Sequence, residues 1–233
     1  MNGKVIRVWD LPTRIFHWTL VALVIAAFVT IKIGGNAVVW HGRIGQLVVA
    51  LIAFRIIWGF IGSTYARFFN FVRGPGAILD YIKGKWHGAG HNPLGALSVL
   101  GLLALVGFQA VSGLFTTDDI AFQGPLYRMV SRDMAATITG WHRLAEWFIY
   151  ALVTLHVLSV IFYAVVKKKD LVRPMITGTM TVPAGSSDES ARGGGMVAFI
   201  IALLLSAAVW WIADGGLLSP PPPPPPPAPA LSW

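Results

Sequence analysis

Five long runs of mostly apolar residues alternate with polar or charged segments along the chain. The runs cover residues 15–33, 38–61, 94–115, 141–166 and 197–213. A helix of about 20 apolar residues crosses the hydrocarbon core of a bilayer, which is roughly 30 Å thick. Lipid hydrates no backbone group, and a helix satisfies all of its own backbone hydrogen bonds. The pattern therefore predicts an all-α membrane protein with five spanning helices.

The composition agrees with a membrane protein and limits the chemistry that the chain can carry. Of its 233 residues, 55% are hydrophobic and only 12% are charged, which is too apolar for an ordinary soluble domain. The absence of cysteine excludes thiolate-bound iron–sulfur clusters, covalently attached c-type haem and disulfides in this chain. A metal cofactor would have to be held by histidine, methionine or carboxylate side chains.

The formal net charge of +8 is explained by the segments between the runs, not by nucleic-acid binding. Basic residues collect in the cytoplasmic loops of membrane proteins. Here they gather at the N-terminus, between the second and third runs, and after the fourth run: Lys4, Arg7, Arg14, Arg67, Arg73, Lys83, Lys85, Lys167, Lys168, Lys169 and Arg173. We therefore expect a multi-pass protein of the bacterial inner membrane, with a cytoplasmic N-terminus and a periplasmic C-terminus. We also expect the first run to be retained and not cleaved as a secretory signal, because it is long and contains His17.

The chain after residue 175 differs in composition from the part before it. Residues 176–196 are rich in Gly, Ser, Thr and charge, which predicts a flexible cytoplasmic linker before a fifth transmembrane helix at 197–214. Residues 215–233 form a periplasmic proline-rich tail, with unbroken proline at 220–227. Such a run is a stiff polyproline II rod. Two interpretations stay open for it: a spacer, or a strand that docks a partner protein.

Two histidines on the fourth run indicate a binding function. His142 and His156 are 14 residues apart, which on a helix is about 40° short of four full turns and ~21 Å along the axis. Both imidazoles are therefore expected on one face, one near each edge of the hydrocarbon layer. Ionisable side chains inside a membrane are costly, and by default they mark functional sites.

The other membrane histidines match this pair by depth. His41, at the start of the second run, is expected on the outer side with His142, and His17 on the inner side with His156. Two neutral imidazoles from opposing helices are what a six-coordinate b-type haem needs as axial ligands. We therefore predict two bis-histidine b haems. The alternative, in which the histidines serve in packing or proton relay, explains one membrane histidine better than four at matching depths.

Arginines near the predicted haems are candidates to bind the haem propionates. Arg55 lies 14 residues after His41 and shares its helix face at the depth of the inner pair. A buried guanidinium there requires an anion, which a propionate would supply. The alternative is that Arg55 extends to the cytoplasmic interface. Arg14 and Arg143 are further candidates for the same role.

His87 and His91 form a His-x3-His pair in the segment before the third run. This spacing can bind a metal on a helix, but Gly88, Gly90 and Pro93 make the segment a poor helix, and no third ligand is evident. We expect solvated loop histidines. The alternative is a role near the inner haem, such as proton delivery to a quinone.

Four features of the chain stand out together: Leu11-Pro12-Thr13-Arg14-Ile15-Phe16-His17-Trp18, Trp40-His41 with Arg55 beyond it, Gly90-His91-Asn92-Pro93-Leu94-Gly95, and the His142/His156 pair. Together they resemble the bacterial cytochrome b561 family, in particular its branch related to the cytochrome b subunits of nickel–iron hydrogenases. The resemblance covers roughly residues 5–175. It implies that residues 1–175 form a four-helix transmembrane bundle that binds two b haems.

The resemblance also implies a function, which is electron transfer between the quinone pool, for example ubiquinone, and a periplasmic or membrane redox partner. That partner would be a c-type cytochrome or an oxidoreductase subunit. Two alternatives stay open. In one, the chain is a haem-bearing anchor or accessory subunit of a larger oxidoreductase or respiratory complex, as the fifth helix and tail favour. In the other, it is a haem-free transporter or proton channel, although the sequence shows no inverted repeats or broken helices.

Overall fold

The computed structural model describes residues 3–86, 88–120 and 122–219. Two features singled out in the sequence, His87 and the proline run 220–227, lie outside these residues. Within the described ranges, five helices are long and apolar enough to cross a membrane: α1 (Leu11–Ile33), α2 (Ala37–Ile61), α5 (Pro93–Gly113), α6 (Arg132–Val165) and α8 (Met196–Ala213). The predicted all-α membrane fold with five candidate spanning helices is confirmed.

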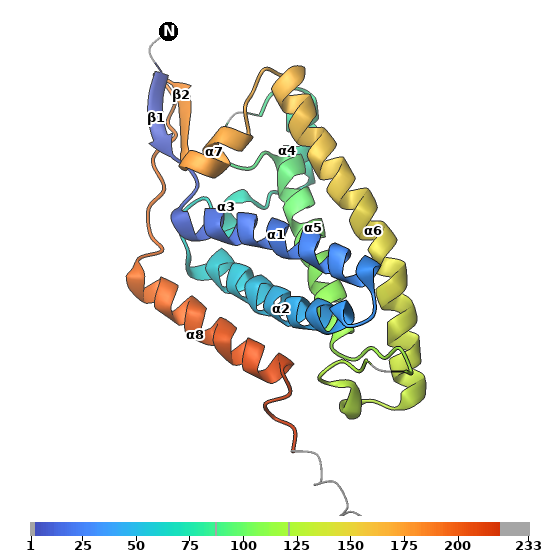
Figure 1. The fold of residues 1–233 in the computed structure, drawn as a ribbon. Coiled ribbons are helices and arrows are strands. Elements are labelled where there is room, and N and C mark those ends of the chain that lie inside the picture. The colour runs from blue at the N-terminus through green and yellow to red at the C-terminus, as the bar shows by residue number, and fades with distance from the viewer. Residues whose placement is uncertain (1–2, 87, 121, 220–233) are drawn as a thin grey trace, which may run out of the picture.

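Shorter elements connect these helices: β1 (Gly3–Arg7), α3 (Phe68–Phe71), α4 (Pro75–Ile82), the 3-10 helix η1 (Tyr127–Met129), α7 (Val172–Thr177) and β2 (Thr179–Pro183). All but η1 lie at one end of the bundle, which we call the sheet end (Figure 1). The turn 34–36 between α1 and α2 and the connection 114–131 lie at the opposite end, which we call the loop end.

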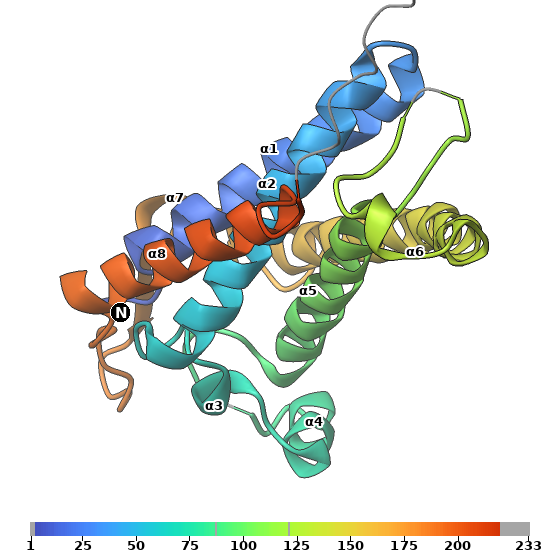
Figure 2. The same ribbon diagram turned by 90° about the horizontal axis from the view of Figure 1, so that it is seen from below.

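The spanning helices are arranged around α2 (Figures 1 and 2). Helices α1 and α8 both pack against α2, and α5 packs against α2 and against α6. One buried cluster joins α2 to α5 and includes Val49, Ile52 and Val106. A second cluster joins α2 to α1 and α8 and includes Trp58 and Ala202. Helices α1 and α6 keep most of their surface exposed, which suits helices that face lipid.

Helix α6 is longer than its apolar run predicts. The hydrophobic pattern places the start of this helix at residue 141, beside His142, but the helix begins at Arg132. The Ser131 hydroxyl accepts a hydrogen bond from the backbone N–H of Met134 at 3.2 Å and so caps the first turn. Apolar periodicity misses this part because a helix that extends beyond the hydrocarbon can be polar. His142 therefore lies about three turns inside α6 and does not begin it.

At the sheet end, the N-terminus pairs with the segment that follows α6. Strands β1 and β2 are antiparallel, with Gly3 opposite Pro183, and their pairing helps to bury Ile6. The backbone N–H of Thr64 donates a hydrogen bond to the carbonyl of Arg192 at 2.9 Å. Residues 176–196, whose composition predicts a flexible linker, therefore contain a strand and contact the loop after α2. Composition reports local preference and cannot reveal pairing with a strand at the far end of the chain.

Trp58 is expected to stabilise the sheet end of the bundle. Its side chain has 0% exposure, stacks on Phe54, meets Phe199 of α8 edge-on, and donates a hydrogen bond to Asp10 Oδ2 at 3.0 Å. We expect Trp58→Ala to cost ~3–5 kcal/mol, seen as a lower thermal unfolding midpoint of the purified protein in detergent. Trp147→Ala is the matched control because Trp147 is 70% exposed. Equal losses in the two variants would contradict this role.

Candidate functional site

The structure brings His41 of α2 and His142 of α6 together at the loop end. Their ring centres are 6.3 Å apart, and the ring planes are nearly perpendicular, at 89°. Both side chains are half-buried. Two residues that are distant in sequence thus lie side by side at the loop end.

Hydrogen bonds orient both rings of this pair. Nδ1 of His41 lies 2.9 Å from the carbonyl oxygen of Ala27 on α1 and donates to it. Nδ1 of His142 lies 3.1 Å from Oγ of Ser112, whose own hydroxyl donates to the carbonyl of Gln109. His142 Nδ1 is therefore the donor in that contact, and this network assigns the lone pair of each ring to Nε2.

Helix α5 holds His142 more directly than the sequence suggests. Besides the Ser112 contact, the amide Nε2 of Gln109 lies 3.2 Å from Nε2 of His142. A Cβ added at Gly113 would come within 3.1 Å of the His142 ring. The sequence interpretation gave α5 no part in the site. The available signal was two polar residues three positions apart near the end of a mostly apolar helix, which places them on one face.

The second pair, His17 of α1 and His156 of α6, lies toward the sheet end. The two imidazoles are within electrostatic range of each other, and both are half-buried. Nδ1 of His17 is buried and has no hydrogen-bond partner among the described residues. An unpaired buried nitrogen is costly, so this ring is suited to a ligand that the protein alone does not supply.

An ion pair that sequence reasoning missed ties α1 to α6 beside the outer pair. Lys32 Nζ lies 2.9 Å from Oε1 of Glu146, which also accepts a hydrogen bond from the Tyr150 hydroxyl at 2.9 Å. The Tyr150 ring stacks on Phe28 of α1 at 4.6 Å. Glu146 follows His142 by four residues, so both side chains lie on one face of α6. An acidic residue within an apolar run was the signal for this contact.

The candidate arginines differ in their surroundings. Arg55 is 2% exposed, donates to the carbonyl of Ala66 at 3.2 Å, and lies over the ring of Phe68. It makes no ion pair within the described part of the chain. Arg14 donates to the carbonyl of Ile176 in α7. Arg143 is exposed beside His142.

His91 is half-buried and packs against aromatic rings. Its ring lies 4.6 Å from that of Trp9 and 4.5 Å from that of Phe71, and its Nδ1 is buried with no partner in the described ranges. Burial, followed by the positive charge of Arg55, lowers the pKa of His91 from its ordinary value of 6.5 to about 3. No cluster of three or more potential metal-ligating His, Asp or Glu side chains occurs among the described residues. His91 is therefore a neutral packing residue near Arg55.

The fold and the two histidine pairs define a class of protein: a multi-pass helical membrane protein in which one helix presents a histidine to each of two neighbouring helices. Residues 8–178 match the family model described as prokaryotic cytochrome b561. The chain belongs to this family, as the sequence motifs predict. Membership implies b-type haem and haem-mediated electron transfer. Helix α8 lies beyond the matched residues.

Similar curated proteins are cytochrome subunits named for hydrogenases. The chain is 22% identical to the probable Ni/Fe-hydrogenase 1 B-type cytochrome subunit of Escherichia coli (strain K12), with 73% of this chain and 88% of that protein covered. It is 24% identical to the probable Ni/Fe-hydrogenase B-type cytochrome subunit of Azotobacter chroococcum mcd 1, with 74% and 87% covered. The search of solved structures found no significant match.

The lowered pKa of His91 predicts a pH dependence of stability. The unfolded chain binds a proton at His91 near pH 6.5, whereas the folded chain does not until about pH 3. Above about pH 6.5, His91 is neutral in the folded and the unfolded chain, so its pKa shift does not change the free energy of unfolding. Below that pH, the unfolded chain binds the proton and the folded chain does not, so the free energy of unfolding decreases as the pH falls. We expect the thermal midpoint of the wild type to fall more between about pH 7.5 and about pH 5 than that of His91→Gln. Parallel pH profiles for the two proteins would contradict this assignment.

Proposed function

We propose that this chain transfers electrons across the membrane through two b haems, each held by two histidines. His41 and His142 would hold one haem near the loop end, and His17 and His156 the other near the sheet end. Family membership supports the haem type. The pairing is inferred from the geometry of this chain. Its main support is the position of the His41 ring beside the His142 ring.

The spacing of the loop-end rings fits a shared metal ion. Two metal–nitrogen bonds of about 2 Å, with about 1.1 Å from each nitrogen to its ring centre, separate the centres of two axial imidazoles by about 6.2 Å. The ring centres of His41 and His142 are 6.3 Å apart. A Cβ added at Gly45 on α2 would meet none of the described atoms within 4 Å, so the backbone is open on that side.

The hydrogen bonds of the pair suit this role as well. A ring that donates through Nδ1 keeps its Nε2 lone pair for a metal and is held in one orientation. Ala27 and Ser112 supply the acceptors for His41 and His142. Gln109 would give up its contact with Nε2 of His142 when that nitrogen becomes a ligand. A haem with two axial histidines exchanges single electrons and has no open iron position, which favours electron transfer over oxygen chemistry.

The charges of the two ends support an orientation. The sheet end carries basic residues from the N-terminus, from the loop after α2 and from the segment after α6, so it would face the cytoplasm of a bacterial inner membrane. The loop end would face the periplasm. Electrons would then pass between the quinone pool and a periplasmic or membrane redox protein, such as a c-type cytochrome.

A second candidate function is that of a haem-bearing membrane anchor within a larger oxidoreductase. The similar proteins are named as cytochrome subunits of hydrogenases, which favours this function. Helix α8, which packs on α2 outside the family match, is an addition that a particular assembly would use. Purification from the native membrane distinguishes the two: a stoichiometric redox subunit that remains bound supports the anchor, and quinone turnover by the isolated chain supports the independent cytochrome.

Haem content tests the pairing. We expect two haems per chain, and we expect His142→Ala and His41→Ala each to remove one haem and spare the other, because each variant breaks only the loop-end pair. The haem-to-protein ratio and the reduced b-type absorbance of the purified protein measure this. His91→Gln is the control and should retain both haems. Loss of both haems in His142→Ala with the fold intact, or a wild type without haem, would overturn the proposal.

The buried charge of Arg55 should raise the potential of the sheet-end haem, where we propose that it faces a propionate. Removing a cation near a haem favours the oxidised iron, so Arg55→Gln should lower one of the two midpoint potentials by about 60 mV, a tenfold change in a one-electron equilibrium. Redox titration followed by absorbance measures both potentials. Arg143→Gln, an exposed arginine beside His142, is the control and should leave the sheet-end haem unchanged. Unaltered potentials in Arg55→Gln would exclude this role.

A further inference from the structure

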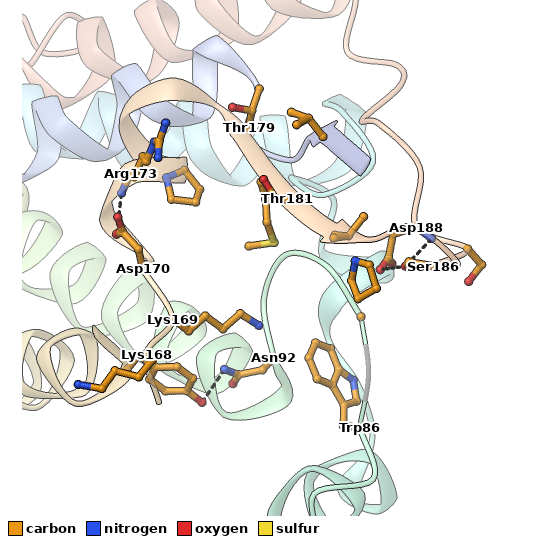
Figure 3. A pocket seen from close by; sticks show the side chains of 18 of the residues that line it. Trp86, Asn92, Lys168, Lys169, Asp170, Arg173, Thr179, Thr181, Ser186 and Asp188 are labelled. Carbon is orange, nitrogen blue, oxygen red and sulfur yellow. Dashed lines mark hydrogen bonds between the residues drawn. The ribbon is translucent and has the colours of Figure 1, made fainter. Parts of the chain in front are cut away.

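A large cavity lies at the sheet end, and none of the four paired histidines lines it. Its volume is about 1040 Å³, and it is enclosed by the end of α6, α7, strand β2 and the loop before α5. Figure 3 shows the Lys169 side chain extending into the cavity from one side, with Trp86 and Asn92 on the opposite side. Neither the haem proposal nor the family match gives this space a function.

The cations of the cavity are available, whereas its carboxylates are already engaged. Asp170 accepts hydrogen bonds from two backbone N–H groups at the start of α7, at 2.9 and 3.0 Å. Asp188 accepts from the Ser186 hydroxyl at 2.7 Å and from a backbone N–H at 3.2 Å. Lys169 and Arg173 line the cavity and form no ion pair within the described residues. Lys168 also lines the cavity, so three cations face two carboxylates there, and the cavity has a net positive charge.

Uncharged donors lie beside these cations. Asn92 uses its side-chain oxygen to cap α5, and its Nδ2 donates to the Tyr163 hydroxyl at 3.0 Å. The hydrogen of that hydroxyl has no acceptor among the hydrogen bonds of the described residues, so it can be donated to a ligand. Ammonium, guanidinium and hydroxyl donors together suit the oxygens of a phosphate group.

The cavity adjoins the boundary between apolar and polar surface. Helix α6 ends at Val165, and the apolar side chains of its last turns, including Phe162 and Val165, are exposed. Trp86, which lines the cavity, contacts the ring of Tyr81 edge-on at 6.0 Å. This surface offers a contact for each part of a phospholipid. The exposed apolar side chains suit the acyl chains, the aromatic rings suit the membrane interface, and the cations suit an anionic headgroup.

We propose that this cavity binds the phosphate of an anionic phospholipid, with Lys169 and Arg173 as its principal contacts. The acyl chains would lie along the exposed last turns of α6, and the headgroup would lie between α7 and the loop that carries Trp86. A soluble phosphate compound shares the phosphate chemistry but cannot use the apolar surface beside the cavity. The lipid would thereby join α6 to the β1–β2 sheet at the sheet end.

The experiment titrates the full-length haem-loaded protein in detergent with phosphatidylglycerol and counts bound lipids by native mass spectrometry. Phosphatidylcholine with the same chains is the uncharged comparison. We expect tighter binding of phosphatidylglycerol, and a loss on the order of tenfold in Lys169→Gln/Arg173→Gln, because each basic group near the surface contributes to anionic lipid binding. Arg73→Gln/Lys83→Gln is the matched control: it removes one arginine and one lysine charge at the sheet end, and neither residue lines the cavity.

The alternative outcomes are decisive. Equal affinity for the two lipids, or undiminished phosphatidylglycerol binding in the double variant, would overturn the site. Binding of inorganic phosphate that Lys169→Gln/Arg173→Gln abolishes, together with equal affinity for the two lipids, would show that the cavity takes free phosphate and not lipid. If the double variant does not fold, Lys169→Arg/Arg173→Lys, which keeps both charges, and Lys169→Gln alone serve instead: the first should retain binding and the second should weaken it. Haem content in each variant reports separately on the proposed electron-transfer function.

Discussion

An imidazole inside hydrocarbon destabilises a membrane helix unless its ring nitrogens have partners, and the packing around α6 follows from this constraint. The helix carries His142 toward one end of the bundle and His156 toward the other. At the loop end, α5 supplies Ser112 and Gln109, so that both nitrogens of His142 have contacts. At the sheet end, Nδ1 of His17 has no partner among the described residues. The protein thus satisfies the ring nitrogens of His142 more fully than those of His17.

Helix α2 connects the remaining parts of the bundle to this arrangement. It carries His41 at the loop end and buries Arg55 and Trp58 toward the sheet end. Helices α1, α5 and α8 each pack against it, so a change in its tilt would move several contacts together. The Lys32–Glu146 ion pair adds a direct bond between α1 and α6. The lysine side chain is 67% exposed, so this pair beside the loop-end histidines contributes only modestly to stability.

The sheet end combines several roles in a small volume. Strands β1 and β2 hold the chain after α7 against the N-terminus. Buried Arg55 and half-buried His91 lie within electrostatic range of each other, and the cationic cavity lies at the same end of the bundle. Helix α8 begins at this end as well, directly after the segment that contacts the loop behind α2. Its position outside the family match means that the chain adds a fifth helix to a family core without displacing α1 or α5 from α2.

The sequence alone determines the features that repeat along a helix: five apolar runs, the depth of each histidine, and the motifs of the cytochrome b561 family. These follow from local chemistry, because spanning length and helical register are set by residues near one another in the chain. Tertiary structure decides the rest. It shows that α6 begins at Arg132, that Ser112 and Gln109 hold His142, and that residues 179–183 pair with the N-terminus. Helical periodicity predicts the helix face on which a side chain lies. Which residue of another helix contacts that side chain depends on how the helices pack.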